Sequence, residues 1–138
     1  MNYYAVIDTN VIVSAMLNPD SIPGLVLKYA LAGIIIPLLN KDIFDEYRDV
    51  ISRDKFAFDK KDIDDVLSSI KQKAITLERT ATEEQFVDQK DIVFYEIVLT
   101  ARSETESYLV TGNIKHFPNK PFVVTPKEMV DIINNTQL

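Results

Sequence analysis

Short apolar runs alternate along the chain with longer stretches in which apolar residues recur every three or four positions. The short runs are rich in β-branched and aromatic residues and are typical of buried strands, and the longer spacing is typical of amphipathic helices. We expect strands at residues 3–7, 34–36, 74–77, 108–110 and 122–124. Strands that alternate with helices predict an α/β fold with a mostly parallel central sheet.

Helices are expected between these strands and after the last one. Asn40 is a candidate cap for the third helix, and Thr125, with a proline after it and Glu128 three residues on, is typical of a helix start. Pro37 is expected to end the second strand or to lie at an edge position. Because no repeat, low-complexity segment or linker interrupts the pattern, the 138 residues are expected to form one domain.

The first strand ends in three polar residues, Asp8, Thr9 and Asn10, before apolar spacing resumes. In open α/β sheets, ligands bind at the carboxyl ends of the strands, so a polar triplet at this position points to chemistry. The alternative is that Asp8 or Thr9 only caps the helix that follows.

Four acidic residues lie in or beside helices where apolar residues dominate. Glu46 falls at the edge of the apolar stripe of the third helix, and its alternative role is a boundary residue paired with Lys or Arg. Asp91 opens the most apolar helix, residues 91–103, where the helix dipole also favours an acid, and Asp88 is a candidate cap. Glu96 shares a face with apolar residues in the same helix and therefore needs a partner if buried, which a nearby Lys, Arg or metal would supply.

Thr111 and Asn113 follow the strand at residues 108–110, on either side of a glycine. They are candidates for the same sheet edge as Asp8, or simple turn residues. His116 is the only histidine, which disfavours a zinc site built on histidines. Lys115 and His116 are candidate phosphate contacts, with exposed loop residues as the alternative.

The composition narrows the function classes. With no Cys, the chain has no thiolate catalysis and no Cys-ligated zinc or iron–sulfur site, which fits a cytoplasmic protein. No signal peptide and no apolar run of the roughly 20 residues that span a bilayer is visible. The formal net charge of −6 argues against binding of nucleic acid through a broad basic surface. Carboxylates that bind divalent cations would contribute to this negative charge. P-loop, dinucleotide-binding and serine-hydrolase motifs are absent.

Asp8 and Asn113 are expected at carboxyl ends of strands, Asp91 at a helix N-terminus and Glu46 at a helix edge. Carboxylates gathered at one end of a parallel sheet would raise one another's pKa. A hard cation relieves this repulsion, and ligation by oxygen alone suits Mg²⁺ or Mn²⁺.

These residues give the chain a resemblance to PIN domains of the VapC-like kind. The resemblance covers nearly the whole chain and is carried by four motifs in order, at residues 6–11, 46–48, 88–96 and 108–113. It implies a three-layer α/β/α sandwich, metal-dependent cleavage of RNA with Mg²⁺ or Mn²⁺, and the toxin role of a toxin–antitoxin pair. A cognate antitoxin and a homodimer are partners that the resemblance implies.

Asp8, Glu46 and Asp91 match the first three acidic positions of that family and are expected to hold the metal. Asn113 falls where many relatives carry a fourth Asp, so the site would lose one negative charge but keep an amide oxygen. The remaining expected roles complete the site. Water or phosphate is positioned by Thr9, Asn10, Asp88, Glu96 and Thr111, and RNA is contacted by Arg48, Lys115 and His116.

Two alternative functions remain open. A strand that ends in Asp8-Thr9-Asn10 is also found in haloacid-dehalogenase-like phosphatases, where Asp8 would be the nucleophile. In this chain, however, Asn10 replaces the acid that transfers protons in that family, and no paired-Asp metal motif follows. The second alternative is a PIN-like module that binds RNA or a protein without cutting.

Overall fold

The computed structural model describes residues 2–136, in which five strands form one sheet. All strand pairs are parallel, and the order across the sheet is β3-β2-β1-β4-β5. This confirms the predicted α/β class with a parallel sheet. The strands are β1 (Tyr3–Ile7), β2 (Ile35–Leu39), β3 (Ile75–Thr76), β4 (Ser107–Val110) and β5 (Val123–Val124).

Local capping signals set the starts of several helices. The Asn40 side chain accepts a hydrogen bond from the Ile43 amide at 2.9 Å, and Thr125 and Glu128 form the reciprocal pair of a capping box, at 2.9 and 3.1 Å. The helices are α1 (Thr9–Leu17), α2 (Ile22–Leu31), α3 (Lys41–Ile51), α4 (Lys60–Lys73), α5 (Ile92–Arg102) and α6 (Pro126–Thr136). Short 3₁₀ turns lie at η1 (Asp54–Phe56), η2 (Gln89–Asp91) and η3 (Ile114–His116).

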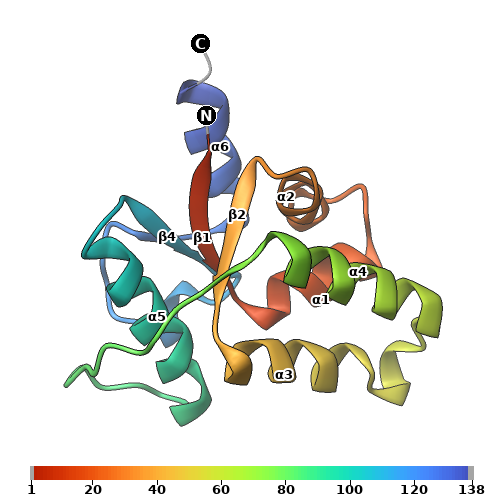
Figure 1. The fold of residues 1–138 in the computed structure, drawn as a ribbon, viewed down its shortest axis with the longest axis horizontal. Helices are drawn as coiled ribbons and strands as arrows, with labels where there is room; N and C mark the ends of the chain where they lie inside the picture. The colour runs from red at the N-terminus through yellow and green to blue at the C-terminus, as the bar shows by residue number, and fades with distance from the viewer. Residues whose placement is uncertain (1, 137–138) are drawn as a thin grey trace.

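The helices cover both faces of the sheet, which gives the expected three layers. Helix α5 packs across β1, β2 and β4 on one face, whereas α2 and α6 pack together over the other. Helix α3 contacts α1 and α5 and lies below the carboxyl ends of β1 and β2 in Figure 1. None of the helices within residues 2–136 has the length and apolar character needed to cross a bilayer.

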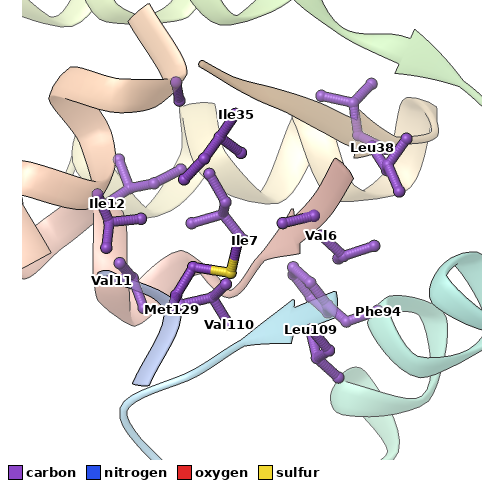
Figure 2. Close-up of a cluster of buried hydrophobic side chains, with 14 of the residues drawn as sticks. Val6, Ile7, Val11, Ile12, Ile35, Leu38, Phe94, Leu109, Val110 and Met129 are labelled. Carbon is purple, nitrogen blue, oxygen red and sulfur yellow. The ribbon is translucent and has the colours of Figure 1, made fainter. Parts of the chain in front are cut away.

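The core forms because neighbouring residues of each strand point to opposite faces. In Figure 2, Ile7, Ile35 and Val110 lie with Met129 of α6 and with the start of α1, and Val6, Leu38 and Leu109 lie with Phe94 of α5. All eight of these side chains are buried. The apolar runs read from the sequence are therefore buried on both sides, as expected for a covered parallel sheet.

Strand β2 differs from its prediction. Pro37, expected to end the strand or to lie at an edge position, sits inside it, opposite Ala5 of β1, and the strand continues to Leu39. Proline is tolerated there because β3 pairs only with Leu38 and Leu39, so no strand lies on that side of Pro37 to take a hydrogen bond from its nitrogen. Strand β2 is therefore longer than predicted, and α3 begins at Lys41, directly after its carboxyl end.

The register between β1 and β4 places Asp8 and Thr111, the residues that follow these two strands, side by side. Ile7 is opposite Val110, and the Asp8 amide donates to the Val110 carbonyl at 2.9 Å. Chain order reverses direction at β1, since β2 lies on one side of it and β4 on the other. Such a switch point is where open α/β sheets bind ligands, and Asp8 lies directly beyond it.

Candidate active site

Asp8 is buried at the end of β1 and is 7% exposed. Its side chain does not cap α1, although it occupies the N-cap position. Instead, the Thr111 hydroxyl donates to Asp8 Oδ2 at 2.7 Å, across from the end of β4. Helix capping therefore does not explain why a carboxylate stands at this position. Thr9 and Asn10 lie in the first turn of α1, which begins two residues before Val11, where the apolar spacing resumes.

The pKa of Asp8 is raised to about 6, chiefly because burial disfavours the charged form. The negative charges of Asp91 and Glu46 raise this pKa further, and the hydrogen bond from Thr111 lowers it in part. The three carboxylates predicted to act together are therefore close enough to interact electrostatically.

Glu46 is half-buried on α3 and accepts a hydrogen bond from the Thr9 hydroxyl. The next residue, Tyr47, donates its hydroxyl to the Ile7 carbonyl and so fixes α3 against β1. The ion pairs found within residues 2–136 do not include Glu46. The alternative of a boundary glutamate paired with Lys or Arg therefore does not hold in this structure.

Asp91 ends the turn η2, one residue before α5 begins. Its Oδ2 is buried and has no hydrogen-bond partner, and His116 Nδ1 lies 3.5 Å away. Burial, with the neighbouring Asp88, raises the pKa of Asp91. The Asp88 side chain caps η2 by accepting from the Lys90 amide at 2.9 Å. The sequence indicated Asp88 as a cap of the helix itself, whereas in the structure it caps the turn η2, directly before α5.

A cleft of about 760 Å³ opens between α1, α3 and η2. Five of the predicted site residues line it: Thr9, Asn10, Glu46, Asp88 and Asp91. Three more carboxylates of α3 also line the cleft, and so do two basic residues: Asp42, Asp45, Asp49, Arg53 and Lys90. Sequence reasoning missed Lys90 as a site residue, although its position directly before Asp91 in the third motif was an available signal.

The residues after β4 form hydrogen bonds with Asp8 and with the start of α1. Thr111 is fully buried against Asp8, and its Oγ1 also accepts from the Asn113 amide at 2.9 Å. Asn10 Oδ1 accepts from the Gly112 amide at 3.3 Å, which ties α1 to the end of β4. The side chain of Asn113 is exposed and does not line the cleft. The structure thus brings Thr111 to the site and leaves the Asn113 side chain beside it.

Three predicted residues lie away from the cleft. Glu96 is buried, but its oxygens accept from Arg79 Nε at 2.6 Å and from the Thr82 amide at 3.0 Å. Arg48 lies over the Phe44 ring on another side of α3, and Lys115 is exposed on η3. Glu96 thus anchors the segment before η2, and neither Glu96, Arg48 nor Lys115 lines the cleft.

The acidic side chains suit a divalent cation in kind. Carboxylate oxygens are preferred by Mg²⁺ and Mn²⁺, and the unpartnered Asp91 Oδ2 together with the raised pKa of Asp8 indicates negative charge that lacks compensation. Among residues 2–136, however, no three acidic or histidine side chains are grouped closely enough to hold an ion as they stand. The hydrogen bonds from Thr111 to Asp8 and from Thr9 to Glu46 keep two of them engaged.

A family model described as PIN domain matches residues 4–115. This range includes β2 and β4, the two neighbours of β1 in the sheet, together with the whole of α3 and the turn that carries Asp91. A search of curated proteins found no match to the chain.

Proposed function

The chain belongs to the PIN domain family, whose members are generally nucleases, and we propose that it is an endoribonuclease dependent on Mg²⁺ or Mn²⁺. The observation that carries this proposal is the placement of three acids: Glu46 and Asp91 line one cleft, and Asp8 is buried at the strand end next to it, where the order of the strands reverses. The charges of Glu46 and Asp91 raise the pKa of Asp8. Three acids that lie around the ligand-binding edge of a parallel sheet suit a metal-dependent phosphodiesterase.

In this proposal Asp8, Glu46 and Asp91 hold the cation, which when bound lowers the pKa of a water molecule and offsets charge on the phosphate. Thr111 and Thr9 orient two of these carboxylates through the hydrogen bonds that they donate. Lys90 and Arg53 supply the positive charge in the cleft and are suited to the phosphates on either side of the cut bond.

The toxin role, a cognate antitoxin, a homodimer and action in the cytoplasm are further parts of the proposal. They rest on the resemblance to VapC-like PIN domains. A partner encoded beside this gene that co-purifies with the protein and suppresses its RNA cleavage would support the toxin role, and a partner with no effect on cleavage would count against it.

The test is cleavage of a mixed pool of single-stranded and hairpin RNA, with Mn²⁺ or with EDTA. We expect cutting by the wild type in Mn²⁺, and a loss of at least about a hundredfold in Asp91→Asn, which removes one carboxylate from the cation site. Asp131→Asn is the matched control, because Asp131 is exposed on α6, outside the cleft, and forms an ion pair with Lys127 at 3.1 Å.

Equal cleavage by Asp91→Asn and the wild type would contradict the proposed role of this acid. RNA that is bound but left intact in Mn²⁺ would instead favour the non-cleaving module. Hydrolysis of small phosphomonoesters, with RNA left intact, would favour the phosphatase alternative, in which Asp8 is the nucleophile.

A further inference from the structure

Phe56 differs from the other phenylalanines of the chain. The chain has seven, and six of them either belong to the hydrophobic core or pack against it: Phe44, Phe58, Phe86, Phe94, Phe117 and Phe122. Phe56 lies outside both groups and is half-exposed. Its side chain instead lines the cleft that also contains Glu46 and Asp91. Core packing therefore does not account for an aromatic residue at this position.

The backbone and a second ring hold Phe56 in place. It ends the turn η1, in which the Phe56 amide donates to the Arg53 carbonyl at 3.1 Å, and Ala57 then reverses the chain with φ of 54°. The Phe58 ring lies nearly parallel to it, with 5.6 Å between centroids and 12° between the planes. Because Phe58 packs against the core, the Phe56 ring is held from within the protein.

Two cationic side chains lie near Phe56. Arg53 lines the cleft and reaches Asp49 at 3.3 Å, and Lys55, which does not line the cleft, places its Nζ over the Phe56 ring, 5.1 Å from the ring centroid. Six carboxylates also line the cleft. An aromatic face beside cationic side chains is the combination with which proteins bind single-stranded nucleic acid.

We propose that Phe56 stacks on an unpaired base of the RNA, and that Arg53 contacts the adjoining phosphate. Arg53 follows Glu46 by seven residues along α3 and its end, a rise of about 10 Å, so this subsite binds a nucleotide away from the cut bond. The inference rests on the proposed nuclease function and adds a residue that selects unpaired substrate. A base in a duplex is already stacked on its neighbours and leaves no free face for Phe56.

The test is the binding of a labelled, unstructured RNA oligonucleotide, measured by fluorescence anisotropy in Ca²⁺, which takes oxygen ligands but has looser geometry than Mg²⁺. Phe56→Leu keeps an apolar side chain without a π face, and Phe56→Tyr keeps the ring. We expect Phe56→Leu to weaken binding by about tenfold and Phe56→Tyr to stay within about twofold of the wild type. The same strand annealed to its complement should bind both variants and the wild type equally.

Arg53 is tested by the salt dependence of the same binding. We expect Arg53→Gln to lower the slope of log Kd against log salt by about 1, because one phosphate contact is lost. Lys73→Gln removes an exposed positive charge at the end of α4, outside the cleft, and should leave the slope unchanged.

Equal affinity of Phe56→Leu and the wild type for the single strand would overturn the stacking role, as would a wild type that binds no RNA. A loss of the same size for the duplex would also overturn it, because a general structural defect would then explain both losses. Binding that depends on Phe56 without any cleavage in Mn²⁺ would overturn the nuclease proposal and support the subsite. The two failures are therefore distinguishable.

Discussion

Asp8 is held in a position where ionisation is unfavourable. The carboxylate is buried, and within residues 2–136 the side chain that donates a hydrogen bond to it is that of Thr111. Two further carboxylates face the same region. A carboxylate in such a place destabilises the folded protein unless a cation binds, so its presence points to function rather than to packing.

The stability of the metal-free protein should therefore depend on pH through Asp8. Its pKa rises from 3.8 to about 6 on folding, so the folded state favours the protonated form. This favourable contribution is complete below about pH 3.8 and is lost as pH rises through 6. Asp8→Asn cannot ionise and should be more stable than the wild type at pH 7.5 by about 2 kcal/mol, with little difference near pH 4.

Urea unfolding of both proteins in EDTA at the two pH values measures this difference. Asp131→Asn serves as the control, since Asp131 is exposed and its removal affects only a surface ion pair. A wild type that is as stable as Asp8→Asn at pH 7.5 would mean that Asp8 is not destabilised by its surroundings.

The acidic residues show how far single residues can be read from the sequence. Glu46 and Glu96 were both predicted to take part in the site because each lies beside apolar residues of its helix. The structure separates them: Glu46 lines the cleft, whereas Glu96 is paired with Arg79. Arg79 belongs to a stretch with neither helix nor strand, so nothing in the local pattern could show that this partner would reach Glu96.

At the scale of elements, the starts of the helices that carry a capping residue are more predictable than the extents of the strands. Asn40 and Thr125 cap α3 and α6 through hydrogen bonds to residues three positions on, which are local in sequence. Strands β3 and β5 have two residues each and exist only through their neighbours in the sheet. The continuation of β2 through Pro37 likewise depends on which strand lies beside it.

The start of α2 gives a test at this scale. Gly24 lies in the first turn of α2, and a Cβ built on it would meet the Pro19 carbonyl oxygen at 2.2 Å. Because that atom belongs to the backbone, it cannot move aside without shifting the turn. We expect Gly24→Ala to lower the free energy of unfolding by about 1–3 kcal/mol.

Urea unfolding measures this effect, with Lys28→Ala on the exposed side of the same helix as the control. Lys28→Ala should change stability by less than about 0.5 kcal/mol. A Gly24→Ala variant as stable as Lys28→Ala would show that α2 and the preceding turn are less tightly packed than the structure indicates.

At the scale of the molecule, the order of the strands is what assembles the site. The sequence predicts parallel strands with polar residues at their ends, and carboxyl ends of parallel strands meet at one edge. It does not predict that β1 lies at the centre, or that α3 and η2 line one cleft with the start of α1. These arrangements depend on contacts between segments far apart in the chain. Three separate weak motifs thus come to the same edge of the sheet only in the folded molecule.

The central claim is that Asp8, Glu46 and Asp91 form one cation site. The most direct measurement is Mn²⁺ binding by isothermal titration calorimetry to the wild type and to Asp8→Asn, Glu46→Gln and Asp91→Asn, with Asp131→Asn as the control. We expect the wild type and the control to bind alike and each of the other three to bind at least about tenfold more weakly, because each loses a charged oxygen ligand. Mn²⁺ affinity unchanged in all three would contradict the claim.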